Sequence, residues 1–430
     1  MNNTEREILV KANGIRQWFP VKKKFFFDKQ KYVKAVDGVD IELYRGETLG
    51  VCGESGCGKS TLLRTCLRLI EPTDGKITYE GENITFLKKR RMKKIREHMQ
   101  IVFQDPYSAL DSRMKVGKII EEPMIINRSP KSKAERKARV AELMAQVGLD
   151  PSYIDRYPHE FSGGQRQRIV IARALATRPE LLFCDEAVSA LDVSVRAQIL
   201  NLLEELQDEL KLTYMFVSHD LSVIEHICDR IVIMYLGKIV EVGTKDDIFK
   251  NPKHPYTQAL LSAIPMVGKK ERDRIILQGD IPSPVNPPAG CRFHTRCPYA
   301  TERCATEVPA VYCLGGDHKV ACHLVEGEGV LDVPVALEEK SAEREELAQK
   351  TLRRGILSAA LSVLGIPAWI IGNKGLKSAA RFVRCEGAVY GKAKVGKILS
   401  IVGKTLGIIN TLAYIAAFVI GLILGAGWLG

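Results

Sequence analysis

Short apolar runs recur through the first 245 residues, and polar or turn-forming residues bound each of them. Runs of this length predict buried strands. They lie at 47–53, 99–103, 181–184 and 213–217. A glycine-rich loop and a helical run from Lys59 to about Ile70 follow the first of them. The order strand, glycine-rich loop, helix opens an α/β unit with a parallel sheet.

Two further stretches complete the pattern of this region. Residues 105–162 are polar and mostly helical in character, which predicts a helical insertion between strands. Residues 231–242 predict a β-hairpin that turns at Gly237. The sequence shows no internal repeat.

The composition changes after Asn251. Residues 279–290 are rich in proline and glycine, and residues 291–322 hold five cysteines. Residues 326–350 carry eight acidic and three basic side chains, which indicates a solvated linker entering a helix. From residue 351 onward, basic segments alternate with apolar segments.

The net charge of +12 would suggest nucleic-acid binding if it were spread over the chain. Residues 351–430 contain ten Lys and Arg and one acidic residue, so +9 of the charge belongs to the tail. We therefore expect no nucleic-acid partner. The N-terminus has no apolar run after a basic start, which predicts no signal peptide and a cytosolic body. Cysteines in that compartment are thiols or metal ligands more often than disulfides.

Residues 53–61, GESGCGKST, form a phosphate-binding loop between a strand and a helix. Glycines let backbone N–H groups surround phosphates, and the helix N-terminus favours an anion. Lys59 is placed for the β- and γ-phosphates, and the Ser60 hydroxyl for Mg²⁺. The candidate nucleotide-binding residues of this loop are Gly53, Ser55, Gly56, Cys57, Gly58, Lys59, Ser60 and Thr61.

Other polar groups follow predicted elements in the same way. Asp185 and Glu186 close an apolar strand, where a carboxylate faces the ligand crevice of a parallel sheet. Asp185 fits an Mg²⁺-associated role, and Glu186 fits a general base or water-orienting group. Two carboxylates after a strand are also common at the start of a solvated loop. Ser162 is a good helix N-cap, and Gly163 and Gly164 permit close approach of an anion.

The motifs GESGCGKST, IVFQDP, FSGGQRQR, LLFCDE, SALD and FVSHD together resemble those of ATP-binding cassette (ABC) ATPases over about residues 8–245. The resemblance implies an α/β fold, with a P-loop RecA-like core, a helical subdomain and a small β region. It also implies ATP and Mg²⁺ as ligands. It places Gln104 where it senses Mg²⁺ and the attacking water and faces a membrane partner. It places His219 near the γ-phosphate, although a histidine after a strand is more often a capping or core residue.

The same resemblance assigns residues that act across a dimer. It implies that Ser162, Gly163, Gly164 and Gln165 contact ATP bound to the opposite subunit. Residues 189–192, which end in Asp192, then line the dimer interface. Tyr32 is the candidate for stacking on adenine, and an ordinary surface tyrosine is the alternative.

Two stretches narrow the family. Residues 103–123 and 251–265 are similar to one ATPase type of oligopeptide/dipeptide importers and to its C-terminal module. This resemblance implies peptide import powered at the cytoplasmic face of the cell membrane. The implied partners are a second ATPase subunit, two transmembrane permease subunits and an extracellular solute-binding protein. An ATPase that serves nickel or another small solute is an alternative. A non-transport ABC ATPase is a second one, although such proteins usually carry two cassettes or a long coiled-coil insertion.

Four cysteines follow the spacing C-x5-C-x6-C-x17-C, at Cys291, Cys297, Cys304 and Cys322. The spacing leaves free thiols, zinc and an iron–sulfur cluster open. Resemblance to the cysteine motif of peptide-importer ATPases implies a [4Fe–4S] cluster on these four, with Cys313 outside the pattern. The rival ligands are His294, His318 and His323.

The tail departs from that family. Residues 405–430 hold 26 residues without a charge, enough to cross a bilayer as a helix. The segment 373–404 carries eight Lys and Arg and one acidic residue, so it should stay cytosolic. Residues 356–372 are shorter and interrupted by Pro367, which favours an interfacial or re-entrant segment. The alternative is a soluble helix packed on the body or on a partner.

We thus expect four parts. They are an ABC nucleotide-binding domain at 1–250, a cysteine-containing C-terminal module at 251–324, an acidic linker at 325–350 and a basic and apolar tail at 351–430, a candidate membrane anchor.

Overall fold

The computed structural model describes residues 6–23, 30–264 and 275–331, and the single positions 353, 401, 402 and 405. The chain divides into two compact units, Met1–Val333 and Pro334–Gly430.

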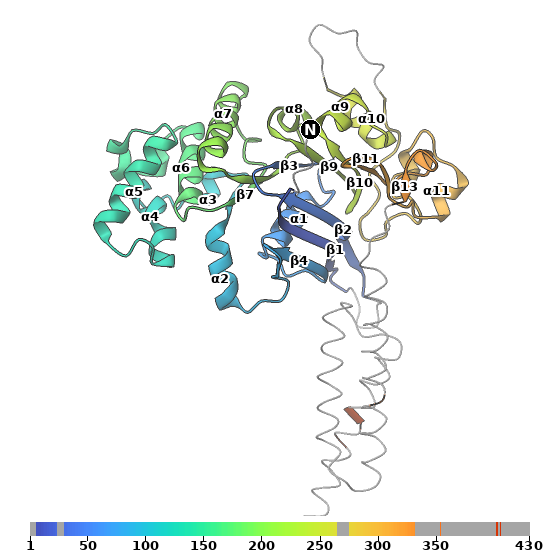
Figure 1. Ribbon diagram of the computed structural model, residues 1–430, viewed down its shortest axis with the longest axis horizontal. Coiled ribbons are helices and arrows are strands. Elements are labelled where there is room, and N and C mark those ends of the chain that lie inside the picture. The colour runs from blue at the N-terminus through green and yellow to red at the C-terminus, as the bar shows by residue number, and fades with distance from the viewer. Residues whose placement is uncertain are drawn as a thin grey trace, which may run out of the picture. The chain divides into compact units, whose positions relative to one another are not determined.

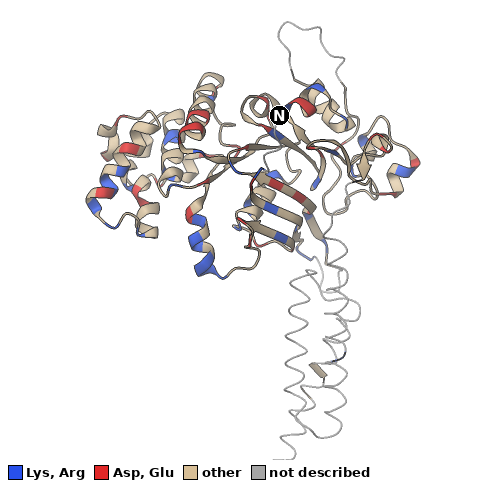
Figure 2. Cartoon of the chain, in the orientation of Figure 1, with Lys and Arg blue, Asp and Glu red and all other residues tan. Residues whose placement is uncertain are grey.

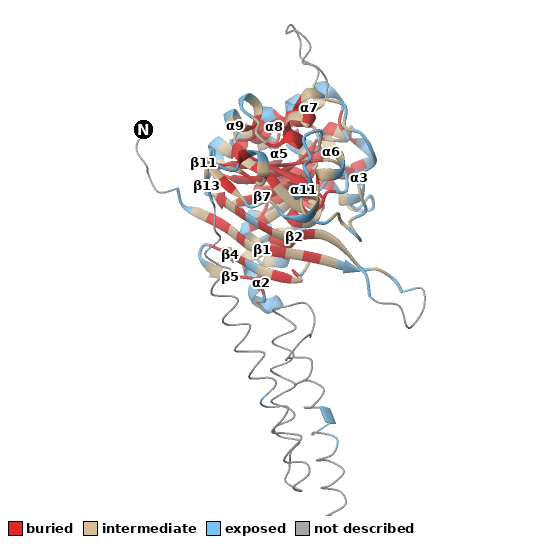
Figure 3. Ribbon diagram, turned by 90° about the vertical axis from the view of Figure 1, so that its right-hand side faces the viewer, coloured by how far each residue is buried: buried red, intermediate tan, exposed pale blue. Residues whose placement is uncertain are grey.

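A nine-stranded sheet forms the centre of this unit (Figure 1). Its parallel strands run in the order β9-β3-β8-β7-β6. Every residue of β3, β7, β8 and β9 is buried (Figure 3). The four apolar runs are therefore confirmed as strands of a parallel sheet. The bounds are β3 Thr48–Cys52, β6 Met99–Val102, β7 Leu181–Asp185, β8 Thr213–Val217 and β9 Arg230–Tyr235.

Alternate residues of these strands enter two different hydrophobic cores. Leu182 and Cys184 of β7 belong to a core shared with the helices. Leu181 and Phe183 belong to a core shared with a smaller, antiparallel sheet. Both faces of the sheet are thus covered, which explains why the strands are apolar without alternation. Helices α1 Lys59–Cys66, α7 Val193–Leu210 and α8 Leu221–Ile227 follow strands of this sheet.

The predicted helical insertion is confirmed. Helices α4 and α5 pack on each other and on α6 (Figure 1). The elements of this region are α3 Pro106–Ala109, α4 Val116–Asn127, α5 Lys133–Gln146, the 3-10 turns η1 Pro151–Asp155 and η2 Pro158–Glu160, and α6 Gly163–Leu175.

A small antiparallel sheet has the strand order β2-β1-β4-β5 and matches the implied β region. The basic helix α2 follows it, and Figure 2 shows most of this helix in the blue of Lys and Arg. The bounds are β1 Ile8–Pro20, β2 Tyr32–Tyr44, β4 Asp74–Tyr79, β5 Glu82–Asn83 and α2 Lys89–His98.

The residues beyond Asn251 extend the nine-stranded sheet. The predicted hairpin is confirmed, since β10 turns back from β9 at Leu236 and Gly237, both with positive φ. Strand β12 then pairs with β10, and β11 and β13 follow at the edge. The bounds are β10 Lys238–Thr244, β11 Tyr312–Gly315, β12 His318–Val320 and β13 Val330–Leu331, with helices α9 Lys245–Lys250, α10 Pro255–Ser262 and α11 Glu302–Thr306 and 3-10 turns η3 His294–Arg296 and η4 His323–Val325.

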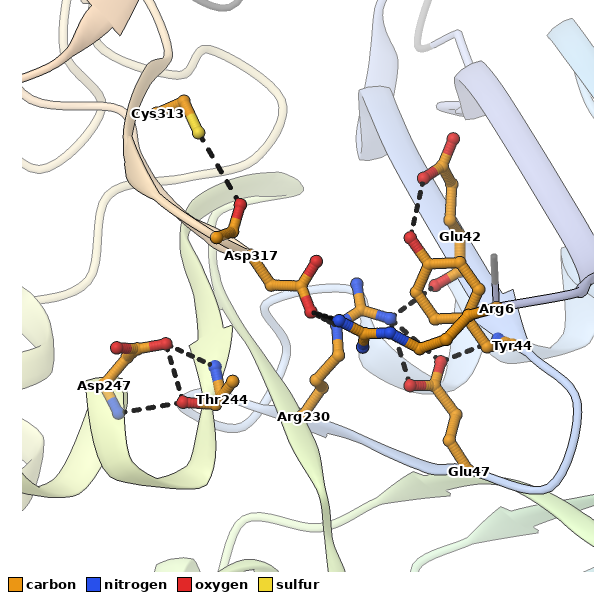
Figure 4. A network of polar contacts seen from close by, with 10 residues as sticks. Arg6, Glu42, Tyr44, Glu47, Arg230, Thr244, Asp247, Cys313 and Asp317 are labelled. Carbon is orange, nitrogen blue, oxygen red and sulfur yellow. Dashed lines mark hydrogen bonds and ion pairs between the residues drawn. The ribbon is translucent and has the colours of Figure 1, made fainter. Parts of the chain in front are cut away.

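Figure 4 shows how the β11–β12 turn is tied to the rest of the unit. Asp317 of this turn pairs with Arg6 at 2.8 Å and lies 3.6 Å from Nε of Arg230. Arg230 in turn donates to both carboxylate oxygens of Glu47, at 2.9 and 3.1 Å. Ion pairs of the buried Arg230 therefore join β9, the β2–β3 turn and the C-terminal strands.

Two expectations differ from the structure or fall outside it. Helix α1 ends at Cys66, earlier than the expected Ile70, because Arg68 takes a left-handed backbone conformation with φ of +58°. The expected span 405–430 lies outside the described residues except for Thr405. Among the residues that are described, no helix is both long and apolar enough to cross a bilayer.

Candidate nucleotide-binding and catalytic site

The loop between β3 and α1 surrounds Lys59. The Lys59 ammonium donates to the carbonyl oxygens of Gly53 at 2.8 Å and Glu54 at 3.1 Å. The loop passes so close to β2 that a Cβ on Gly58, whose φ is +108°, would lie 2.0 Å from the Ala35 carbonyl oxygen. Glycine is required there, and the same close packing holds the N-terminus of α1 open to an anion.

A cavity of about 300 Å³ opens beside this loop. One wall is made of Ser55, Gly56, Gly58, Lys59, Ser60 and Thr61, together with Gln104 and Glu186. Cys57 is buried under the loop, and Gly53 lies against the Met234 carbonyl. The cavity is also lined by Val33, Lys34, Ala35, Leu236, Gly237 and Pro284.

Asp185 lies at the end of β7 and is 2% exposed. Its Oδ2 accepts hydrogen bonds from Nε and Nη2 of Arg64, at 3.2 and 2.9 Å. Its Oδ1 is buried, and no donor from the described part of the chain reaches it. A buried carboxylate oxygen with a free lone pair is a suitable ligand for Mg²⁺, which prefers oxygen donors.

Glu186 is the point where three segments meet. Its Oε2 accepts from Nε2 of Gln104 at 2.8 Å, and its Oε1 lies 3.3 Å from Nδ1 of His219. The three residues follow β7, β6 and β8 respectively, at the carboxyl ends of adjacent parallel strands. Glu186 itself has φ of +50°, a conformation that a residue other than glycine keeps at a cost and that clusters at functional sites.

The chain matches the sequence profile described as "ABC transporter" over residues 36–189, and that described as "Oligopeptide/dipeptide transporter, C-terminal region" over residues 240–304. It is 51% identical over 328 residues to the oligopeptide transport ATP-binding protein AppF of Bacillus subtilis, covering 75% of this chain and 99% of that one. The chain is a member of the ABC ATPase family. It is also 51% identical to the dipeptide transport ATP-binding protein DppF of Escherichia coli, covering 75% and 96% of the two chains.

A solved structure shares the fold of this ABC ATPase. It is cbiO1 from Clostridium perfringens, part of the ABC transporter complex cbiONQ. The TM-score is 0.50 at 26% identity, with 57% of this chain and 92% of the other covered. The P-loop core with a helical subdomain is therefore confirmed, and ATP hydrolysis with Mg²⁺ is the activity of this family.

The four residues expected to contact ATP on the opposite subunit, 162–165, lie at the N-terminus of a helix. Ser162 and Gln165 form a capping box at the N-terminus of α6, in which the Ser162 N–H donates to Oε1 of Gln165 at 3.0 Å. A Cβ on Gly164 would lie 2.4 Å from Val195, so glycine is needed for α6 to pack on α7. Ser162 is exposed and Gly163 partly so, and Asp192 is exposed at the start of α7. These residues thus present a polar helix end to solvent on the ABC ATPase monomer.

Tyr32 opens β2, directly before the Val33 and Lys34 of the cavity wall. Its ring packs against Trp18, with centroids 6.3 Å apart and planes tilted by 47°. Tyr32 is thus next in sequence to lining residues but is not itself among the residues that line the cavity, and it packs on a second aromatic ring that sequence reasoning did not single out.

The four predicted cluster ligands gather in the C-terminal module. The Cys291 N–H donates to the Cys304 carbonyl oxygen at 2.8 Å. Burial, and then the neighbouring thiols of the set, raise the pKa of Cys291, Cys297 and Cys322, the last to about 11. Each pair among the four interacts in this way. Cys313 lies apart, with its thiol 3.7 Å from the Gly316 carbonyl oxygen (Figure 4).

The rival histidines have other partners. Nε2 of His318 lies 2.8 Å from Glu241, Nδ1 of His294 lies 2.7 Å from the Cys291 carbonyl oxygen, and Nε2 of His323 lies 3.2 Å from the Glu307 carbonyl oxygen. In the described ranges, no group of three His, Cys, Asp or Glu side chains is arranged to hold a single metal ion.

Sequence reasoning missed several residues of the site. Arg64 holds Asp185, and Pro284 reaches the cavity from beyond Asn251. No motif marks either residue. The position of Arg64, one turn after the phosphate-binding loop on α1, could have indicated a contact with the end of β7. The position of Pro284 in a proline-rich segment gives no indication that it lines the cavity.

Proposed function

We propose that this chain is the ATP-hydrolysing subunit of an ABC importer of oligopeptides or dipeptides, working at the cytoplasmic face of the cell membrane. The observation that carries the proposal is the Glu186 carboxylate, held between Gln104 and His219 at the edge of the phosphate-binding cavity. The substrate class comes from relatives named as oligopeptide and dipeptide transport ATP-binding proteins.

The site residues divide the reaction between them. The loop N–H groups and Lys59 bind the β- and γ-phosphates. Ser60 and Asp185 would hold Mg²⁺, which neutralises developing charge between the phosphates. Glu186 orients a water and accepts its proton as the water oxygen bonds to the γ-phosphorus. The bond from that phosphorus to the β–γ bridging oxygen breaks, and ADP and phosphate leave. Gln104 and His219 hold the carboxylate in line for this attack.

A second ATPase subunit completes the site. Ser162, Gly163, Gly164, Gln165 and Asp192 do not line the cavity of the described monomer. A capped helix N-terminus with exposed polar groups suits a γ-phosphate brought to it by another chain. We therefore propose that ATP binds between two ATPase subunits, with the partner a related but different chain. At dilute concentration, hydrolysis by this chain alone should be weak and should rise with added partner. Full activity of the monomer would refute the shared site.

The permease subunits need a docking surface near Gln104. A groove of about 310 Å³ lies between β6 and the helices of the insertion. Phe103, adjacent to Gln104, lines it and is 37% exposed, and Ile126 at its other side is 54% exposed. A cytoplasmic segment of the permease seated there would move Gln104 directly, which supports coupling of transport to hydrolysis. We propose an extracellular solute-binding protein as a further partner only because the relatives are peptide transport proteins.

We propose a [4Fe–4S] cluster on Cys291, Cys297, Cys304 and Cys322. Zinc at about 2.3 Å from each thiolate would draw four sulfurs into a tight tetrahedron. A four-iron cluster binds one thiolate on each iron and so uses four cysteines. Backbone contact between Cys291 and Cys304 and the mutual effect of the four thiols support this ligand set. Anaerobic purification should give brown protein with iron and sulfide, whereas stoichiometric zinc would replace the cluster.

We also propose domain boundaries at residues 250, 324 and 350. We propose a membrane anchor at 405–430. The uncharged 26-residue stretch supports the anchor. Expressed without partners, the full chain should resist a carbonate wash of membranes, and a chain ending at Lys350 should be released. Equal release of both would leave 405–430 as a soluble or partner-binding segment.

Purification of the chain with its native partners, reconstitution into liposomes and measurement of ATP-dependent uptake test the function itself. Uptake of labelled di- and oligopeptides is expected. Uptake of nickel in their place would assign the chain to a small-solute transporter, and a complex without permease subunits would refute transport.

A further inference from the structure

Glu54, the second residue of the phosphate-binding loop, contacts two distant residues. Its N–H donates to the Tyr256 hydroxyl oxygen at 2.9 Å. Its carboxylate accepts two hydrogen bonds from Arg296, from Nη1 at 2.7 Å and from Nη2 at 3.1 Å. Its carbonyl oxygen accepts from Lys59 at 3.1 Å. One loop residue thus joins the phosphate-binding lysine to two side chains from beyond Asn251.

These contacts are shielded from water. The Arg296 side chain is 8% exposed and that of Glu54 24%, and Tyr256 is fully buried. The Tyr256 ring packs against Tyr235 and Phe293, at centroid distances of 4.8 and 5.3 Å. A two-point arginine–carboxylate pair with little exposure fixes both partners in direction as well as in distance. Most exposed ion pairs contribute little by comparison.

Other residues of the C-terminal module also contact residues that line the cavity. Pro284 lines the cavity, and its carbonyl oxygen accepts from the Lys34 N–H at 3.1 Å. Arg292 donates to the carbonyl oxygen of Leu236, another lining residue, and pairs with Asp37. Residues 284–296 therefore contact both the phosphate-binding loop, at Glu54, and other residues that line the cavity, at Lys34 and Leu236.

We propose that Arg296 and Tyr256 are positioning residues for the phosphate-binding loop, so that the C-terminal module sets the affinity of this subunit for ATP. The inference rests on the proposed nucleotide site at Lys59. Holding Glu54 by its side chain and its N–H fixes the carbonyl group that orients Lys59. It also fixes the backbone that leads into Ser55. A loop that is ordered before the nucleotide arrives loses less entropy on binding.

The test compares Arg296→Gln with Arg303→Gln. Arg303 lies in the same module, but it pairs with Glu307 of the module and with Glu326 just beyond it, and neither partner belongs to the phosphate-binding loop. Binding of a fluorescent ATP analogue to the full chain should weaken about fivefold in Arg296→Gln, the loss expected when a shielded charge-assisted pair is removed. Arg303→Gln should bind as wild type. Amide hydrogen exchange over residues 52–60 should speed up in Arg296→Gln and not in Arg303→Gln.

Two more variants separate positioning from general support of the fold. Glu54→Gln should weaken binding to a similar degree, and the double variant Glu54→Gln/Arg296→Gln should be no weaker than Arg296→Gln, since both act through one contact. At saturating ATP, turnover of Arg296→Gln in the assembled transporter should stay within about twofold of wild type, because this variant changes binding. Should Arg296→Gln fail to fold, Arg296→Lys and Glu54→Gln carry the comparison.

Wild-type affinity and exchange in Arg296→Gln would overturn the inference, as would losses that multiply in the double variant. A different result would show that the proposed nucleotide site at Lys59 is itself wrong. In that case wild type and Lys59→Ala would bind the analogue equally poorly, whatever residue stands at 296.

Discussion

The side-chain amide of Gln104 donates a hydrogen bond to Oε2 of Glu186 at 2.8 Å, across 82 residues of sequence. The other oxygen of the carboxylate faces His219. Gln104 follows Phe103, which lines the groove proposed for the permease. A shift at that groove would reach the proposed catalytic carboxylate through one hydrogen bond, a short route for the proposed coupling of transport to hydrolysis.

Arg64 should stabilise the subunit before it binds Mg²⁺. In Arg64→Gln, the buried Asp185 carboxylate loses two charge-assisted hydrogen bonds, which should destabilise the fold by about 1–2 kcal/mol. Mg²⁺ with a non-hydrolysable ATP analogue should recover part of this loss, since the ion restores a partner to Asp185. Thermal denaturation with and without ligand measures both effects. The control Lys250→Gln, which breaks an exposed ion pair with Asp246, should change stability little.

Cluster assembly should depend on Cys322 and not on Cys313. Cys322→Ser removes a proposed ligand and should lower iron and labile sulfide sharply, with loss of the brown colour. Cys313→Ser should keep both, because its thiol is turned to the Gly316 carbonyl oxygen. Equal iron loss in the two variants would show that the ligand set is wrong.

His254 should make the fold sensitive to acid. Burial lowers the pKa of His254 to about 4, and the neighbouring Glu241 opposes this only in part. The unfolded chain binds a proton near pH 6.5 and the folded chain near pH 4, so stability is full above 6.5 and falls as pH drops between these values. The loss is at most about 3 kcal/mol.

His254→Asn provides the control for this titration. The His254 ring nitrogen caps α10 by accepting from the Tyr256 N–H at 3.1 Å, and asparagine also caps helices. Denaturation midpoints measured from pH 7 to 4.5 should fall less in this variant than in wild type. Parallel curves for the two proteins would rule out His254 as the source.

Local pattern predicted the nucleotide core because its strands are short, apolar and followed by chemistry-bearing loops. The Gly237 hairpin and the helical insertion followed from the same kind of signal. The pairing of β12 with β10 did not, because a three-residue strand has no pattern of its own and its partner lies far away in sequence. For the same reason the Arg296–Glu54 pair, 242 residues apart, could be found only in three dimensions.

The role of Glu186 is tested most directly by steady-state ATP hydrolysis in the assembled transporter, comparing wild type with Glu186→Gln. Glutamine keeps the shape of the side chain but cannot accept the proton of the attacking water. Binding of Mg²⁺ and ATP should be unchanged, and turnover should fall by about 100-fold or more. Turnover within a factor of about two of wild type, in protein shown to bind ATP normally, would contradict the account.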